Sequence, residues 1–250
     1  MAKNKNLILG IDIGGTGIKA GLVDIKKGDI VGEPIKIKTP SPSSPENIKK
    51  VVEEVIRQFD YKGPVGVGFP AIVHNGTIAS AANIDKKWIG TNAEKLFNKI
   101  KGCRFYVAND ADMAGMAEIH FGFGKGKKGT IILITIGTGL GSALFINGVL
   151  VPNTEFGHLN YKAADYEFYA SNTAREKKHM SWTAWGNQFN HFMKHLEFIF
   201  SPDLILLGGG LSKRWDDFKS QINVKVKVRP ATLQNHAGII GAAAFARVSD

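Results

Sequence analysis

The most informative stretch of this chain is 7-LILGIDIGGTGIKAGLVDI-25. Two apolar runs rich in β-branched residues flank a glycine-rich turn, which is the pattern of a β-hairpin. The turn also carries Asp12 before its glycines and Lys19 after them, and an ordinary hairpin turn needs no such charges. Glycine lets phosphate oxygens approach converging backbone N–H groups, and a carboxylate beside phosphate needs a divalent cation between the two. The turn therefore predicts a site for phosphate and Mg²⁺.

A second hairpin in the middle of the chain repeats this pattern. The segment 130-TIILITIGTGLGSALFING-148 is again a strand, a glycine–threonine turn and a strand, and Thr138 adds a hydroxyl donor as Thr16 does in the first turn. The two copies predict two related lobes, each offering a turn to a shared cleft. A third glycine cluster, 207-LGGGLSK-213, follows an apolar run. It either meets phosphate at a helix N-terminus or contains a left-handed turn residue.

Composition narrows the class of protein. The chain has 250 residues, of which 44% are hydrophobic, so it can bury one large core or two small ones. Its single cysteine, Cys103, excludes an internal disulfide and a cysteine-rich zinc site, and it is typical of a reducing cytosol. The N-terminus is no convincing signal peptide and no apolar run reaches membrane-spanning length. We therefore expect a cytoplasmic protein without a membrane partner.

The net charge of +10 predicts a positive field that attracts anions. Nucleic acid, acidic lipid and a phosphate-rich substrate all fit this sign. The lysines stand in small scattered clusters, as they do on a solvated surface, so a role for the bulk charge is the weaker interpretation.

Strands that alternate with helices predict α/β architecture. Beyond the two hairpins, strands are expected at 30–39, 64–70, 104–108 and 203–207, and helices at 46–59, 91–100, 109–122, 181–200 and 237–248. One apolar stripe lies on the helix at 181–200, and it predicts core or a subunit interface rather than a ligand site. The stripe consists of Trp182, Trp185, Phe189, Phe192, Met193, Leu196 and Phe200.

Two short polar motifs carry candidate catalytic or binding groups. In 108-ANDAD-112, Asn109 is a natural N-cap and Asp110 falls in the first helical turn, where the helix dipole favours its ionised form. Such a carboxylate can take a proton from a substrate hydroxyl, although capping alone is the simpler local explanation. In 153-NTEFGHLN-160, Glu155 and His158 lie in a polar loop, where a metal site would lack the usual cysteine partners.

Together these motifs resemble those of the ROK sugar kinases, a family of actin-like, two-lobed phosphotransferases. The first hairpin matches G-I-D-I-G-G-T-x-x-K and the second matches T-I-G-T-G-x-G, while N-D-A-D resembles the catalytic N-D-A-N and E-F-G-H the sugar-binding E-x-G-H. The match runs from Leu7 to the C-terminal helix. Within the family, the segments 167–176, 181–185 and 195–213 are closest to the polyphosphate glucokinases and polyphosphate–ATP glucomannokinases.

The resemblance implies an α/β, two-lobed, actin-like (ribonuclease H-like) sugar kinase fold with a cleft between the lobes. We expect an N-terminal lobe over 1–110, joined by a C-terminal helix at 237–250, and a C-terminal lobe over 111–236. Most members carry a zinc-binding cysteine cluster after the histidine, whereas no cysteine follows His158, which argues against zinc. Regulators of the family carry an N-terminal helix-turn-helix domain, and we expect none here because the first hairpin starts at Leu7.

The implied activity is transfer of a phosphoryl group from inorganic polyphosphate, with ATP as a further donor, to the 6-hydroxyl of glucose, with mannose as an alternative acceptor. Mg²⁺ is the implied cofactor, and a homodimer without nucleic acid is the expected assembly. A strictly ATP-dependent glucokinase or N-acetylhexosamine kinase shares every motif except the C-terminal segments. A non-enzymatic regulator that binds sugar or DNA is a more distant alternative, against which an intact Asp110 argues.

The same resemblance assigns roles to individual residues. Asp110 is the expected general base, and the sugar-binding set comprises Asn83, Asn109, Asp110, Glu155, His158 and, as the candidate for a second glutamate, Glu167. The donor phosphates are assigned to Asp12, Gly14, Gly15, Thr16, Lys19, Thr138, Gly139, Gly209 and Gly210, and Asp12 would hold Mg²⁺ through water. A long polyphosphate also needs a basic track, for which the candidates are Lys125, Lys127, Lys128, Lys162, Arg175, Lys177, Lys213 and Arg214.

Overall fold

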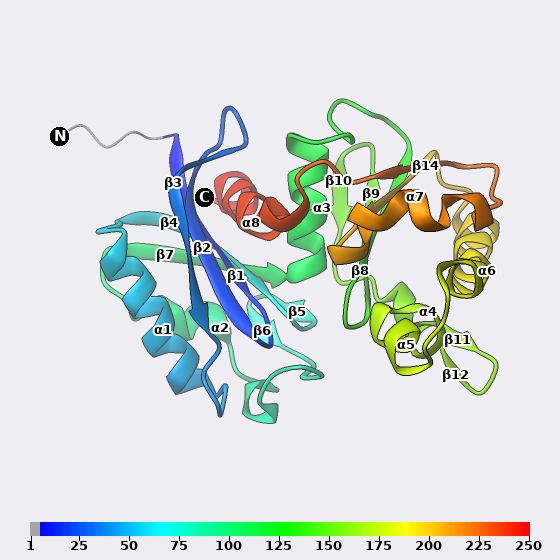
Figure 1. The fold of residues 1–250 in the computed structure, drawn as a ribbon. Helices are drawn as coiled ribbons and strands as arrows, with labels where there is room; N and C mark the ends of the chain where they lie inside the picture. Colours follow the sequence, from blue (N-terminus) through cyan, green and yellow to red (C-terminus); the bar gives the residue numbers. More distant parts are fainter. Residues whose placement is uncertain (1–5) are drawn as a thin grey trace. The chain divides into compact units, whose positions relative to one another are not determined.

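Two five-stranded sheets organise residues 6–250, the part of the chain that this computed structural model describes (Figure 1). The residues divide into two units, one comprising the chain up to Phe121 together with His236–Asp250, and the other comprising Gly122–Asn235. Each unit has its own hydrophobic core.

The first sheet begins with the predicted hairpin and has the strand order β3-β2-β1-β4-β7. The antiparallel strands are β1 (Leu7–Ile13), β2 (Gly17–Asp24) and β3 (Asp29–Lys38), while β4 (Gly63–Phe69) and β7 (Cys103–Asn109) continue the sheet in parallel with β1. The segment between β4 and β7 holds β5 (Val73–His74), β6 (Thr77–Ile78), the 3₁₀ helix η1 (Lys86–Trp88) and α2 (Ala93–Phe97).

Helices cover both faces of the first sheet (Figure 1). On one face, α1 (Pro45–Gln58) begins at the N-cap Ser44 and buries its apolar stripe in the first core. On the other face, the backbone of α8 (Ala237–Ser249) touches the strands directly. A Cβ on Gly10 would lie 2.0 Å from the carbonyl oxygen of Ile239, so glycine in β1 is what permits this contact.

Helix α3 (Asp110–His120) packs against α8 and belongs to the first unit. Their backbones touch, because a Cβ on Gly241 of α8 would lie 1.6 Å from the carbonyl oxygen of Met113 in α3. The division between the units falls after Phe121, whereas the predicted boundary lay at 110. The motifs alone could not place this boundary, because it depends on the contact between α3 and α8. Gly241, which allows that contact, lies far along the chain from α3.

The second sheet is built on the second predicted hairpin and has the strand order β10-β9-β8-β13-β14. Strands β8 (Thr130–Ile136), β9 (Leu140–Ile146) and β10 (Val149–Val151) are antiparallel, and β13 (Leu204–Gly208) and β14 (Lys227–Pro230) run parallel to β8. A small hairpin of β11 (Asn160–Tyr161) and β12 (Ala164–Asp165) lies between β10 and the helices.

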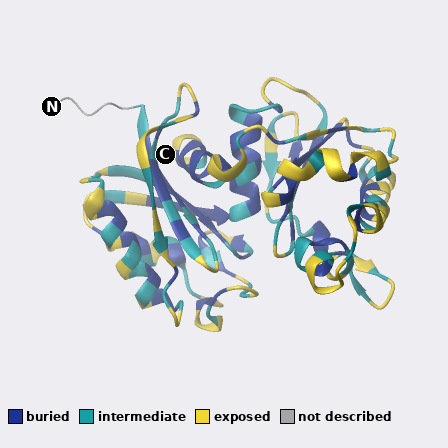
Figure 2. Ribbon diagram, viewed as in Figure 1, coloured by how far each residue is buried: buried dark blue, intermediate teal, exposed yellow. Residues whose placement is uncertain are grey.

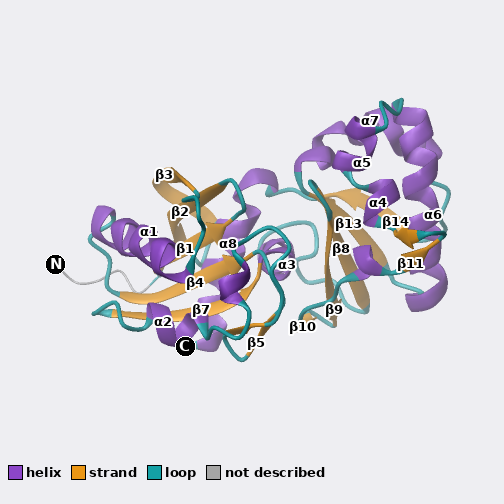
Figure 3. Ribbon diagram, turned by 90° about the horizontal axis from the view of Figure 1, so that it is seen from below, coloured by secondary structure: helices purple, strands orange, loops and turns teal. Residues whose placement is uncertain are grey.

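The helices of the second unit gather on one side of its sheet (Figure 3). They are α4 (Glu167–Ala170), α5 (Asn172–Lys177), α6 (Trp182–Phe200) and α7 (Trp215–Phe218), and the unit also contains the 3₁₀ helices η2 (Phe156–His158), η3 (Gly210–Arg214) and η4 (Lys219–Gln221). A last 3₁₀ helix, η5 (Gln234–His236), leads into α8. None of the helices within residues 6–250 combines the length and apolar character needed to cross a lipid bilayer.

Helix α6 carries the predicted apolar stripe. Figure 2 shows buried residues on the helices and strands of the second unit. Five members of the stripe are fully buried in the second core, namely Trp185, Phe189, Phe192, Met193 and Leu196. Trp182 and Phe200, at the two ends of the helix, are partly buried against the same core. The prediction that this stripe forms core is therefore confirmed.

Candidate active site

The first glycine turn joins β1 to β2, and one buried side chain braces it. Gly14 N–H donates to the Gly17 carbonyl (3.0 Å), and the Thr39 hydroxyl donates to the Gly14 carbonyl (2.6 Å). The N–H of Thr39 also donates to the Thr16 carbonyl at 3.4 Å. Thr39 is buried, while Gly15 and Thr16 at the tip of the turn are exposed. The turn therefore has a fixed shape and an open tip, as a phosphate site requires.

Asn83 lies against the tip of this turn. A Cβ on Gly15 would come within 2.9 Å of the Asn83 carbonyl oxygen, so only glycine allows the two backbones to approach this closely. Asn83 itself is exposed. In the structure, Asn83, a predicted sugar-binding residue, therefore lies next to the first glycine turn, which is predicted to bind phosphate.

Asp12 stands at the end of β1, directly opposite Lys19 in the hairpin register. The Lys19 ammonium lies 3.4 Å from an Asp12 carboxylate oxygen. The backbone of α8 closes the other side, because a Cβ on Gly238 would fall 2.6 Å from the Asp12 carboxyl carbon. Burial raises the pKa of the Asp12 carboxyl above its usual range, and Lys19 only partly opposes this shift. A partly buried carboxylate with little compensating charge beside it is suited to a cation.

Asp110 begins α3 at the same sheet edge. Asn109 caps the helix, since its side-chain oxygen accepts from the N–H groups of Ala111 (2.8 Å) and Asp112 (3.2 Å), and its amide donates to the Ala71 carbonyl (3.1 Å). This cap fixes the first turn of α3 and with it the position of the Asp110 backbone. Sequence analysis placed both residues correctly as cap and first turn.

Strand register explains why Asp12 and Asp110 share an edge. Gly68 of β4 pairs with Asp12 of β1 on one side and with Ala108 of β7 on the other. These three strands are parallel, so their carboxyl ends meet at one edge, where ligands bind in open α/β sheets. The carboxylate assigned to Mg²⁺ and the carboxylate assigned to proton transfer therefore leave the sheet at the same end.

The second glycine turn, in the other unit, joins β8 to β9. Gly137 N–H donates to the Gly139 carbonyl (3.0 Å), and Thr138 at the tip is exposed. A carboxylate oxygen of Glu167 accepts from the Leu140 N–H at 3.2 Å. A Cβ on Gly139 would lie 2.3 Å from that same oxygen, so the missing side chain leaves room for the glutamate.

The loop with Glu155 and His158 is held by a buried serine. The Ser142 hydroxyl donates to the Thr154 carbonyl (2.7 Å) and accepts from the Phe156 N–H (2.9 Å). Ser142 is 1% exposed, so these bonds fix the loop from inside. The loop then turns through η2, which ends at His158.

Acidic groups surround His158 and influence its pKa. Its Nδ1 lies 2.9 Å from a carboxylate oxygen of Asp165, and this hydrogen bond raises the pKa of His158 above its usual value, with smaller contributions from Glu167 and Glu155. Burial raises the pKa of Glu155, although His158 opposes the shift. Ligand atoms of His158, Asp165 and Glu167 all lie within 4.8 Å of one another, an arrangement that could hold a cation.

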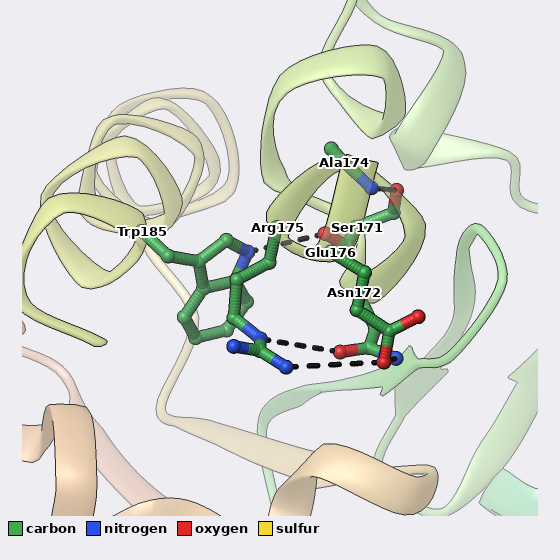
Figure 4. A network of polar contacts seen from close by, with 6 residues as sticks. All are labelled: Ser171, Asn172, Ala174, Arg175, Glu176 and Trp185. Carbon is green, nitrogen blue, oxygen red and sulfur yellow. Dashed lines mark hydrogen bonds and ion pairs between the residues drawn. The ribbon is translucent and has the colours of Figure 1, made fainter. Parts of the chain in front are cut away.

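Helix α5 is tied to the second glycine turn by a backbone hydrogen bond and, as Figure 4 shows, to Trp185 of the second core. The N–H of Asn172 donates to the Gly137 carbonyl (3.1 Å), and Ser171 caps the helix through the Ala174 N–H (3.1 Å). From α6, the indole N–H of Trp185 donates to the Ser171 carbonyl (3.2 Å) and to that of Ala170 (3.0 Å). These hydrogen bonds connect the second glycine turn, α5 and α6.

A pocket of about 530 Å³ opens beside Thr138 in the second unit. Acidic and basic side chains both line it, among them Asp165, Glu167, Lys177 and Lys178. Hydroxyl groups and cations beside the turn that the sequence assigns to phosphate are suited to a polar, anionic ligand.

The third glycine cluster follows β13. Gly209 has φ +75°, and a Cβ there would lie 2.5 Å from the Ile136 carbonyl oxygen, so this glycine is a left-handed turn residue packed against the end of β8. A 3₁₀ helix, η3, follows in place of the α-helix start that the sequence suggested as one alternative. Gly210 at its start is exposed.

Each unit thus gathers part of the predicted set. The first unit holds Asp12, Gly14, Gly15, Thr16, Lys19, Asn83, Asn109 and Asp110, and the second holds Thr138, Gly139, Glu155, His158, Glu167, Gly209 and Gly210. Sequence analysis missed Thr39, Ser142 and Asp165, which brace these groups. Each makes its contact across a gap in sequence that no local pattern signals.

Comparisons with known proteins identify the family. The family model for the ROK family matches residues 8–177. The polyphosphate glucokinase of Mycobacterium tuberculosis strain CDC 1551 / Oshkosh is 43% identical over 242 residues, which is 96% of this chain and 91% of the relative. A glucokinase of Streptomyces coelicolor is 29% identical over 98% of each chain.

Solved structures agree with this assignment. The inorganic polyphosphate/ATP-glucomannokinase of Arthrobacter sp. strain KM matches with a TM-score of 0.93 and 43% identity, over 98% of this chain and 100% of that one. A ROK family glucokinase from Streptomyces griseus, solved with glucose and AMPPNP, matches with a TM-score of 0.82 and 26% identity, over 97% and 99% of the two chains. The chain therefore belongs to the ROK family, and its two α/β units form the two-lobed, actin-like fold of the ROK sugar kinases.

Proposed function

We propose that this protein transfers a phosphoryl group from inorganic polyphosphate, with ATP as a second donor, to the 6-hydroxyl of glucose, and that mannose is an alternative acceptor. The observation that carries the proposal is the placement of Asp110 at the sheet edge where Asp12 and its glycine turn also lie. The relatives named polyphosphate glucokinase and polyphosphate/ATP-glucomannokinase, each 43% identical, support the choice of donor and acceptor.

The proposed chemistry is a single displacement. The 6-hydroxyl oxygen of the sugar attacks the terminal phosphorus of the donor while its proton passes to the Asp110 carboxylate. The bond from that phosphorus to the bridging oxygen breaks, and a shortened polyphosphate or ADP leaves. Asn83, Asn109, Glu155, His158 and Glu167 hold the other sugar hydroxyls.

The backbone turns hold the donor in this proposal. The N–H groups around Gly14, Gly15 and Gly139, with the hydroxyls of Thr16 and Thr138, offer donors to phosphate oxygens, and the Lys19 ammonium adds charge. Gly209 and Gly210 contribute a further backbone segment beside the end of β8.

Magnesium fits the first turn. The Asp12 carboxylate is partly buried, pairs with the Lys19 ammonium at 3.4 Å, and lies beside exposed backbone at Gly15 and Thr16. We therefore propose that Asp12 holds Mg²⁺ through water, where the ion would neutralise charge on the donor phosphates.

The donor preference is directly testable by steady-state assay of glucose 6-phosphate formation. We expect kcat/KM for polyphosphate to exceed that for ATP and to rise with chain length. A long polyanion that contacts many cations should also lose affinity steeply as salt rises, by analogy with counterion release from nucleic acids. If kcat/KM is higher for ATP, and if the reaction with polyphosphate depends on neither chain length nor salt, the protein is an ordinary ATP-dependent glucokinase. Binding of random duplex DNA without sugar phosphorylation would indicate a regulator instead.

We propose that activity requires no zinc. No cysteine follows His158 in the sequence, so the thiolate ligands of the usual structural zinc sites are missing there. Metal analysis after purification without chelators should give far less than stoichiometric zinc, and a zinc-selective chelator should leave activity with Mg²⁺ unchanged. Stoichiometric zinc whose removal abolishes turnover would overturn this expectation.

We further propose a homodimer that works in the cytoplasm without nucleic acid. Phe198 and Ile199 on α6 are 86% and 47% exposed, and a second copy could bury such apolar side chains. Light scattering during size-exclusion chromatography should give twice the chain mass. A monomer mass at micromolar concentration would exclude the dimer.

A further inference from the structure

Among the residues proposed to bind the sugar, only His158 has two ring nitrogens that can face a ligand. Its side chain is 51% exposed, and its backbone ends the short 3₁₀ helix η2. An exposed imidazole can turn about its side-chain bonds and can carry its proton on either nitrogen. A defined contact with a sugar hydroxyl therefore requires another group that fixes both the ring and its tautomer.

Asp165 makes such a contact with the ring. One of its carboxylate oxygens lies 2.9 Å from Nδ1 of His158. A carboxylate only accepts hydrogen bonds, so Nδ1 carries the proton and donates this one. The other ring nitrogen, Nε2, is then the atom that the imidazole offers to a ligand.

The carboxylate of Asp165 is itself held in place. Its second oxygen accepts from the Phe168 N–H at 3.2 Å, at the start of α4. In the β11–β12 hairpin, which lies beside α4 (Figure 1), Asp165 pairs with Asn160. The Tyr166 N–H also donates to the Leu159 carbonyl at 3.1 Å. The returning strand therefore places Asp165 beside the end of η2.

Both partners of this contact are anchored to the second core. Tyr166, which follows Asp165 directly, is 4% exposed, and its ring lies 4.4 Å from that of Tyr161 and 5.0 Å from that of Phe192 in α6. On the other side, the buried Ser142 hydroxyl holds the loop that leads into η2. Packed side chains therefore determine where the carboxylate and the imidazole meet.

We infer that Asp165 is a positioning residue of the sugar site, which holds the His158 ring with Nδ1–H toward its own carboxylate and Nε2 toward a hydroxyl of the acceptor sugar. The inference rests on the proposed function and deepens it, because it explains how an exposed histidine becomes a defined sugar ligand. Asp165 acts through His158 and has no need to touch the sugar itself.

The variant Asp165→Asn tests the tautomer while it keeps the shape of the side chain. An amide has a single oxygen, and the Phe168 N–H takes it as acceptor, so the amide NH₂ faces His158. Nδ1 must then accept, and the proton moves to Nε2. The matched control is Asp203→Asn, because Asp203 also accepts a backbone N–H, that of Thr130 (2.7 Å), at the amino end of β8.

Nitrogen NMR at alkaline pH, where the imidazole is neutral, reads the tautomer without sugar or donor. The variant His158→Gln identifies the signals of this ring. We expect the proton on Nδ1 in the wild type and in Asp203→Asn, and on Nε2 in Asp165→Asn. A wild-type ring with its proton on Nε2, or a tautomer that Asp165→Asn leaves unchanged, would overturn the inference whatever the activity.

Steady-state kinetics at the same pH supply the functional readout. A hydrogen bond to a positioned group contributes up to about a power of ten in affinity, so the KM for glucose should rise about 10-fold in Asp165→Asn. Turnover and the KM for the donor should change by less than about threefold, because this contact holds substrate and transition state alike. In a His158→Gln background the same substitution should raise the KM for glucose no further. Asp203→Asn should leave all three constants unchanged.

The outcomes separate the inference from the function. A further rise in the KM for glucose in the double variant would show that Asp165 acts independently of His158, and would overturn the inference. So would a fall in kcat and Tm of Asp165→Asn with an unchanged KM for glucose, which is the result of a structural role. A wild-type protein that neither binds nor phosphorylates glucose or mannose would overturn the proposed function and the inference together.

Discussion

The Asp110→Asn variant is expected to lose about 10²- to 10⁴-fold in kcat, which is the usual contribution of a general base. Asparagine has the same shape but cannot take the proton from the sugar hydroxyl. The α3 cap is made by the side chain of Asn109, so the helix start should survive the change. Glucose affinity, measured by calorimetry, should remain close to that of the wild type.

A matched control is Asp29→Asn, because Asp29 is an exposed carboxylate in the same unit, at the start of β3. It removes the same charge from the same unit, and it should leave kcat unchanged. An Asp110→Asn variant that keeps more than about a tenth of wild-type kcat would show that the base is misassigned, since a general base typically contributes far more. An equal loss of kcat in Asp110→Asn and Asp29→Asn would instead mean that the overall charge of the unit causes the effect.

Sequence predicted those parts of the site that depend on local pattern. Both glycine hairpins formed where apolar runs flank Gly-Thr turns, and α3 begins at Asp110, directly after Asn109, whose amide oxygen accepts backbone N–H groups. The burial of Trp185 and Phe189 followed from helical spacing alone. These features need only neighbours a few residues apart, which is why periodicity and capping signals suffice for them.

Contacts between distant segments could not be predicted in this way. Thr39 braces the first turn from beyond β3, and Gly238 of α8 lies against Asp12 from the far end of the chain. Asp165 sits in a short polar hairpin whose sequence gives no sign that it bonds His158. The same holds for the unit boundary, which depends on Gly241 meeting Met113. Each is a tertiary contact set by how completed elements pack.

The Asp12→Asn variant should separate activity from stability. Without the carboxylate that would hold Mg²⁺ beside the donor, we expect kcat/KM to fall by about 100-fold or more with either donor. Excess Mg²⁺ should restore little of this loss. Activity within about threefold of the wild type would remove Asp12 from the proposed site, because the ion's contribution is much larger.

The folded protein, in contrast, should be as stable or more stable with asparagine at this position. Burial raises the pKa of the Asp12 carboxyl above its usual range, so the protonated form favours the folded state. That contribution is complete below the unfolded pKa and is lost as pH rises through the folded pKa. At pH values above the pKa of the unfolded state, burial of this carboxyl therefore opposes folding, and neutral asparagine of the same shape removes that penalty.

Thermal melts without Mg²⁺, from acid to neutral pH, would measure this effect. The difference in Tm between Asp12→Asn and wild type should grow in favour of the variant as pH rises, while Asp29→Asn should show no such trend. A variant that melts well below the wild type at neutral pH would mean that the Asp12–Lys19 ion pair stabilises the fold more than burial of the carboxylate costs. A rise in stability together with a loss of turnover would mark Asp12 as a residue that serves the reaction at the expense of the fold.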